Sequence, residues 1–167
     1  MDVRALALAV DEQVYRPPSD CEISMRCYAV MLPEGSEIPE LRLLEKGEGR
    51  RILRRLRLPR GLTALAVTAA GWRAPMEGDG SMEERPSRHP DRKRIHSTTV
   101  VAGDGELVTV LRTADVDPNG RVEVLPGGEG AVPELIQQAW MRARVREDGR
   151  ADVDGEPWAV GDPTCRE

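Results

Sequence analysis

Apolar residues recur every three or four positions in two parts of the chain, one near each end. The first periodic set is Val3, Leu6, Ala7, Val10 and Val14. It predicts an amphipathic helix over residues 2–14, with Asp2 as the capping residue. The second set is Val132, Leu135, Ile136, Ala139, Trp140 and Ala143. Pro133 lies near the start of that segment, where its missing amide hydrogen costs little, so a second helix begins there.

Between these helices, short apolar runs alternate with turn residues. Residues 24–32 and the run LRLLE flank the turn-rich PEGSEIPE and predict two neighbouring strands. The uncharged segment 62–70 predicts a buried central strand. IHSTTVVA and ELVTVLRT flank Gly103-Asp104-Gly105, which predicts a hairpin. RVEVL, after the turn DPNG, is a candidate edge strand.

The segment RRILRRLRLPR, residues 50–60, holds six arginines. Spaced at about 100° per residue over 50–58, its arginines fall on one arc of a helix and Ile52, Leu53 and Leu56 on the opposite arc. The arginines of this arc are Arg50, Arg51, Arg54, Arg55 and Arg57. The pattern predicts a helix that lies on a sheet with its charged side in water and ends before Pro59 and Gly61.

The predicted order is therefore helix, two strands, helix, three strands, helix. We expect an α+β fold with a single mainly antiparallel sheet of about five strands and helices packed on it. Residues 1–145 form this one domain. Residues 146–167, with Asp-Gly turns at 148–149 and 154–155, form a C-terminal extension or a small hairpin.

Charge and composition limit the classes of function that fit this sequence. The chain of 167 residues has a formal net charge of −5, no Phe, and Lys46 and Lys93 as its only lysines. A net negative charge argues against a general polyanion-binding protein, so nucleic acid is an unlikely partner. The arginine arc is kept as the alternative site at which nucleic acid would bind. Arg-rich and Lys-poor composition is typical of a GC-rich genome.

Cys21, Cys27 and Cys165 are odd in number and lack C-x-x-C spacing, as expected for reduced thiols of a cytoplasmic protein. The two histidines, His89 and His96, show no metal-ligand spacing, so no metal or other cofactor is expected. The run ALALAV is too short for a membrane span or a signal segment.

Residues 73–94 form an unusually long polar connection with split charge, acidic first and basic later. The candidate residues for binding a partner or ligand are Trp72, Arg85, Ser87, Arg88, His89, Asp91 and Arg92. Their guanidinium, hydroxyl and imidazole groups suit a phosphate or a carboxylate. Ser87, His89 and Asp91 also suggest a nucleophile–base–acid set, but no G-x-S-x-G elbow accompanies them, so we assign no catalytic residue and lean away from an enzyme.

GWRAP, followed by RPSRHPDRKR and a hairpin, resembles a group of small proteins from high-GC actinobacteria and their phages, to which no activity is assigned. The resemblance covers roughly residues 60–113. It implies a similar provenance and a shared fold.

The leading expectation is a non-catalytic protein-interaction or regulatory module that uses loop 73–94 to bind another protein or a second copy of itself. The alternatives are an enzyme or sensor that binds a phosphorylated small molecule through Arg85–Arg92, and nucleic-acid binding through Arg50–Arg60.

Overall fold

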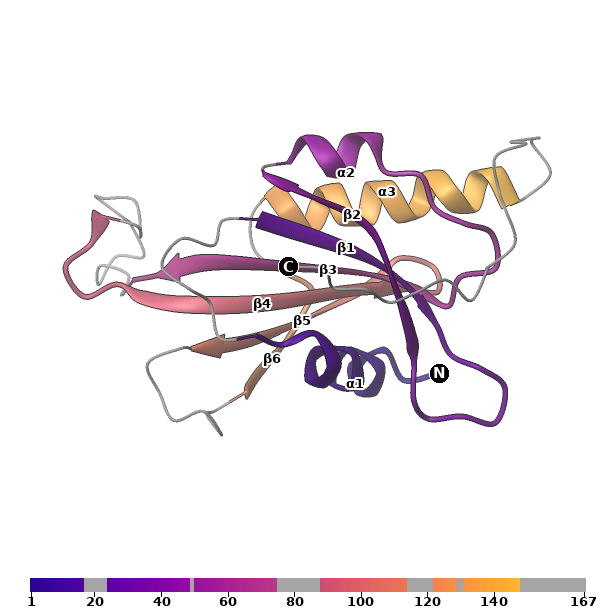
Figure 1. Ribbon diagram of the computed structural model, residues 1–167, viewed down its shortest axis with the longest axis horizontal. Helices are drawn as coiled ribbons and strands as arrows, with labels where there is room; N and C mark the ends of the chain where they lie inside the picture. The colour runs from indigo at the N-terminus through magenta and orange to yellow at the C-terminus, as the bar shows by residue number, and fades with distance from the viewer. Residues whose placement is uncertain (17–23, 49, 75–87, 114–121, 129–130, 148–167) are drawn as a thin grey trace.

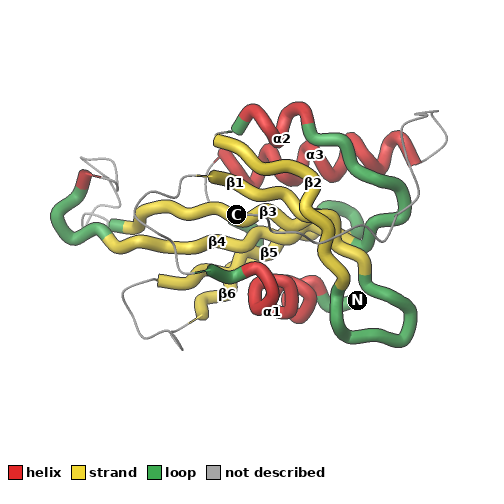
Figure 2. Tube along the Cα trace, viewed as in Figure 1, coloured by secondary structure: helices red, strands yellow, loops and turns green. Residues whose placement is uncertain are grey.

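Six strands form one antiparallel sheet with helices on both of its faces (Figures 1 and 2). The computed structural model describes residues 1–16, 24–48, 50–74, 88–113, 122–128 and 131–147. The elements are, in chain order, α1 (Val3–Val14), β1 (Ser24–Met31), β2 (Glu40–Glu48), α2 (Arg51–Arg55), β3 (Ala64–Arg73), β4 (Lys93–Ala102), β5 (Glu106–Thr113), β6 (Val122–Pro126) and α3 (Ala131–Glu147).

The strand order is β2-β1-β3-β4-β5-β6, and every neighbouring pair is antiparallel. The α+β class and the single antiparallel sheet are therefore confirmed. The sheet has six strands, roughly as expected from the prediction of about five, and RVEVL adds the edge strand β6. The predicted hairpin joins β4 to β5, and Gly103 and Gly105 take the positive φ angles that such a tight turn requires. The predicted C-terminal hairpin, in 148–167, lies outside the described residues.

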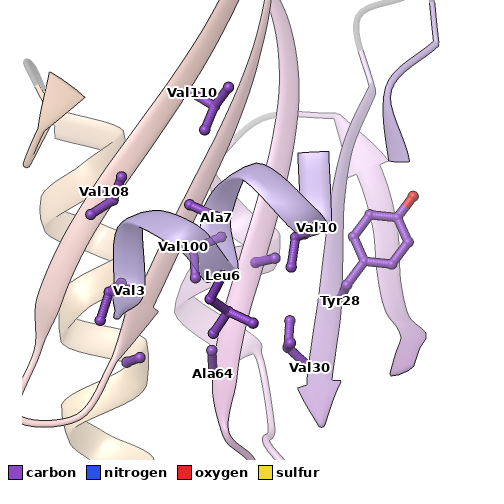
Figure 3. Packing of buried hydrophobic residues seen from close by; sticks show 12 residues of the cluster. Val3, Leu6, Ala7, Val10, Tyr28, Val30, Ala64, Val100, Val108 and Val110 are labelled. Atoms are coloured by element: carbon purple, nitrogen blue, oxygen red, sulfur yellow. The ribbon is translucent and has the colours of Figure 1, made fainter. Parts of the chain in front are cut away.

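Helix α1 covers one face of the sheet (Figure 3). Asp2 caps it as predicted, since its side chain accepts hydrogen bonds from the backbone N–H groups of Arg4 and Ala5. The apolar residues of α1 pack on alternate residues of the strands, because a strand points successive side chains to opposite faces. The buried core of this layer is Val3, Leu6, Ala7, Val10, Tyr28, Val30, Ala64, Ala66, Val100, Ala102, Val108 and Val110.

Helices α2 and α3 cover the opposite face (Figure 1). The strand residues between those that face α1 point to this side, including Cys27, Leu65 and Val101. They pack against Leu53 of α2 and Trp140 of α3, and the Trp140 indole N–H donates a hydrogen bond to the carbonyl oxygen of Gly103. The sheet thus separates two apolar cores, one between it and α1 and the other between it and the helices α2 and α3.

The arginine-rich segment lies on the sheet in the predicted orientation. Ile52, Leu53 and Leu56 are buried, whereas its arginines are exposed. The helix is shorter than the predicted 50–58, since α2 ends at Arg55 and Leu56 has an extended ψ of 128°. Pro59 is the physical reason, because it lacks the N–H that would bond to the Arg55 carbonyl in a continued helix.

The β3–β4 pairing reaches further than the predicted strands. β3 continues to Arg73 and β4 begins at Lys93, so both ends of the predicted loop 73–94 belong to a ladder. Within the described chain, β1 pairs with β3 only as far as Thr68 and β5 pairs with β4 only from Ile95. Residues 72–74 and 88–94 therefore form a projection in which β3 and β4 pair only with each other, which we call the β3–β4 arm (Figure 1).

Candidate functional site

A buried polar cluster lies where α1 ends on the sheet. Asp11 is fully buried, and its carboxylate accepts a hydrogen bond from the Thr98 hydroxyl at 2.7 Å and another from Arg112 Nε at 2.5 Å. His96 Nδ1 lies 3.9 Å from Asp11 Oδ1. The Tyr15 ring meets His96 edge-on and has the Arg112 guanidinium 4.5 Å from its centre.

The alternation of β4 brings this cluster together. His96 and Thr98 lie on the same face as Val100, and His96 is the register partner of Arg112 on β5. Asp11 follows Val10 on the side of α1 that faces the sheet. Both carboxylate oxygens of Asp11 accept hydrogen bonds from these strands, so the cluster attaches the last turn of α1 to the sheet. The negative charge of Asp11 and the positive charge of Arg112 neutralise each other. Sequence reasoning missed it, although Asp11 lies four residues after Ala7, on the apolar arc.

A second cluster lies on the β3–β4 arm, around Trp72. Trp72 is half-buried, and the guanidinium carbons of Arg92 and Arg94 lie 4.9 Å and 4.8 Å from its ring centre. Arg94 is the register partner of Trp72, so the ladder itself sets this contact. Guanidinium groups at such distances are attracted to the face of an indole ring. Of these three, Arg94 was not among the predicted site residues, although its place two residues after Arg92 puts it on the same face.

The arm also positions His89, at the turn that leads into β4. Its Nδ1 accepts a hydrogen bond from the Asp91 backbone N–H at 3.0 Å, and its carbonyl oxygen accepts one from the Arg92 backbone N–H at 3.2 Å. A neutral imidazole that accepts at Nδ1 carries its proton on Nε2. In a catalytic triad Nδ1–H instead donates a hydrogen bond to the carboxylate, so this turn does not present Asp91 as the orienting acid of a triad.

The structure thus joins some of the predicted site residues and separates others. Arg92, Arg88 and Asp91 are all exposed, and Arg92 also contacts Trp72 and donates a hydrogen bond to the His89 carbonyl. Arg85 and Ser87 lie outside the described residues. The arm carries a further ion pair, in which Arg73 bonds to Glu123 of β6 at 2.5 Å.

The arginines of the nucleic-acid alternative lie on the other side of the sheet from α1. Arg50, Arg51, Arg54, Arg55 and Arg57 are all exposed. Arg142 of α3 joins them, because its guanidinium donates a hydrogen bond to the Leu53 carbonyl at 3.0 Å.

Cys27 is fully buried in the α2–α3 core. Burial raises the pKa of its thiol to about 12, and the negative charge of Glu45, its register partner, adds to this effect. Since the thiolate is the reactive form, we expect iodoacetamide to label Cys27 of the folded protein about a thousandfold more slowly than an ordinary thiol, whose pKa is 9.0. Mass spectrometry of the alkylated peptide, with the unfolded protein as control, measures this. Equal rates in the two states would contradict it.

Among the residues that the structure describes, no group of three or more histidine, cysteine, aspartate or glutamate side chains is arranged to hold a metal ion. No helix in that part of the chain is long and apolar enough to cross a membrane. Comparison with protein-family models, with curated proteins and with solved structures found no match.

Proposed function

We propose that this protein is a non-catalytic interaction module that binds another protein through the β3–β4 arm. The observation that carries the proposal is the contact of Arg92 and Arg94 with Trp72 on a projection of the sheet. Tryptophan and arginine are the residue types that most often dominate the energy of protein interfaces. Side chains already ordered against one another lose less conformational freedom when a partner binds.

The charges of the arm suggest the kind of surface that it meets. Arg88, Arg92 and Lys93 are exposed and cationic, whereas Asp91 is the exposed acid between them. The Arg92 guanidinium is held in place by Trp72 and by the His89 carbonyl, to which it donates a hydrogen bond at 3.4 Å. A planar guanidinium held in this way is suited to a carboxylate of the partner.

Replacing Arg92 by alanine is expected to weaken the binding of the partner by roughly thirtyfold, as a hot-spot loss of about 2 kcal/mol implies. Arg4→Ala is the matched control, because Arg4 is an exposed arginine on α1, away from the arm. Quantitative pull-down from a native lysate identifies the partner, and titration with the purified partner measures the affinity. Light scattering tests whether that partner is a second copy of this chain. Equal affinities for wild type and Arg92→Ala would refute the proposal.

One observation favours a phosphorylated small molecule as the alternative ligand of the arm. The hydrogen bond to Nδ1 leaves the proton of His89 on Nε2, where it can be donated to an anion beside Arg92. A thermal-shift series with inorganic phosphate, nucleotides and sugar phosphates separates the two functions. A shift that Arg92→Ala abolishes favours the small ligand. No shift with any of them favours the protein partner.

A further inference from the structure

Two helices that are far apart in the sequence form one surface on the face of the sheet opposite α1. Figure 1 shows α2 lying along α3, and the hydrogen bond from Arg142 to the Leu53 carbonyl joins them. The exposed arc of α2 therefore continues onto α3. Sequence reasoning treated the arc of α2 as an isolated feature.

This surface is rich in arginine. We call it the α2–α3 basic surface and define it by Arg50, Arg51, Arg54, Arg55, Arg57 and Arg142. All six of these arginines are exposed. α3 thus adds one arginine, Arg142, to the five that the sequence pattern had grouped. Such a density of guanidinium groups attracts a partner with closely spaced negative charges.

The apolar side chains of the surface argue against a protein as this partner. The exposed large hydrophobic residues of the described chain are Met1, Ile38, Leu125 and Met141, and of these only Met141 belongs to α2 or α3. Protein interfaces have an apolar centre within a polar rim. Contacts with a phosphate backbone need no such centre, since they are polar, wet and dominated by charge.

The aromatic side chains favour a duplex over a single strand. Proteins that bind single strands stack bases on exposed aromatic rings. The aromatic residue of α2 and α3 is Trp140, which is 3% exposed and whose indole N–H is bonded to the Gly103 carbonyl. Trp72 and Tyr15 belong to other clusters, and Tyr28 is buried under α1. The described part of this surface therefore offers guanidinium groups without a stacking platform.

We propose that the α2–α3 basic surface binds the phosphate backbone of duplex nucleic acid without reading its sequence. Arginine suits this role because its planar fork can hold two phosphate oxygens. The net charge is −5, so binding relies on these local contacts, and each arginine–phosphate contact releases counterions, which makes the binding depend strongly on salt. With about four arginine–phosphate contacts, affinity falls roughly a hundredfold between 50 and 200 mM salt.

Fluorescence anisotropy of the full chain with a labelled DNA duplex of arbitrary sequence tests the proposal. The double variant Arg51→Glu/Arg54→Glu is expected to bind at least tenfold more weakly than wild type at low salt. The control Arg4→Glu/Arg16→Glu changes the net charge equally, on exposed residues of α1 and its end, and is expected to change affinity less than threefold. Arg142→Gln, on α3, is expected to reduce the salt slope by about one. Circular dichroism establishes that each variant is folded.

Four results would overturn the proposal. They are the absence of duplex binding at low salt, equal losses in the two double variants, tighter binding to single-stranded DNA of the same length, and binding to vesicles of anionic lipid or to polyglutamate but not to the duplex. Loss of binding in Arg51→Glu/Arg54→Glu alone supports it. These results are independent of the β3–β4 arm, which Arg92→Ala tests separately.

Discussion

Replacing Asp11 by alanine is expected to lower the free energy of unfolding by about 3 kcal/mol. Breaking a buried ion pair by removing one partner typically costs this much, because the other charge stays buried without compensation. In this protein Asp11→Ala removes the acceptor of both Arg112 and Thr98. The Arg112 side chain is 17% exposed, so water can replace the lost carboxylate only in part.

Urea denaturation followed by circular dichroism measures the effect of Asp11→Ala as a shift of the midpoint at an unchanged slope. Glu12→Ala is the matched control, since Glu12 is the adjacent acid of the same helix and is exposed. That variant should change stability by less than about 0.5 kcal/mol. Asp11→Asn keeps an oxygen that can accept from the Thr98 hydroxyl, so it should lose less stability than Asp11→Ala. A loss below 1 kcal/mol in Asp11→Ala would show that the cluster does not anchor α1.

Replacing Leu53 by alanine is expected to lower the free energy of unfolding by about 3 kcal/mol. Leu53 is fully buried between α2 and the sheet, and the removal of a buried leucine side chain leaves a cavity as well as a loss of apolar burial. Arg54→Ala is the control, because Arg54 is the next residue of the same helix and points into water. Its effect should be small, since alanine is at least as good a helix former as arginine.

The comparison of Leu53→Ala with Arg54→Ala tests the orientation of the arginine-rich segment directly. Similar losses in the two variants, measured by urea denaturation, would contradict the packing described above. The comparison also matters for the α2–α3 basic surface, because Leu53 attaches the arginines of α2 to the sheet and its carbonyl receives the hydrogen bond from Arg142.

The local elements were predictable because their signals are local. The spacing of Val3, Leu6 and Val10 defines the buried arc of α1, and Gly103 and Gly105 define the β4–β5 turn. The end of α2 was less predictable. Pro59 removes a backbone bond to Arg55, and this effect reaches further back along the helix than the side-chain pattern indicates.

The candidate sites were predictable only in part. Trp72 and Arg92 were selected from the sequence, and the structure brings them together. Arg94 and the Asp11 cluster were missed, because the contacts that define them join residues on different strands and helices. His96 and Arg112, for example, face each other only through the register of β4 with β5.

The sequence by itself determined the order and type of the elements, the burial of the central strand and the separation of arginine from leucine along α2, since periodicity and turn residues act over a few positions. Only the tertiary structure decided which charges meet. The partners of Asp11 lie 87 and 101 residues away, and Arg142 joins α2 across 89 residues. Strand order and register bring such residues together, and these depend on the packing of the whole chain rather than on any local pattern.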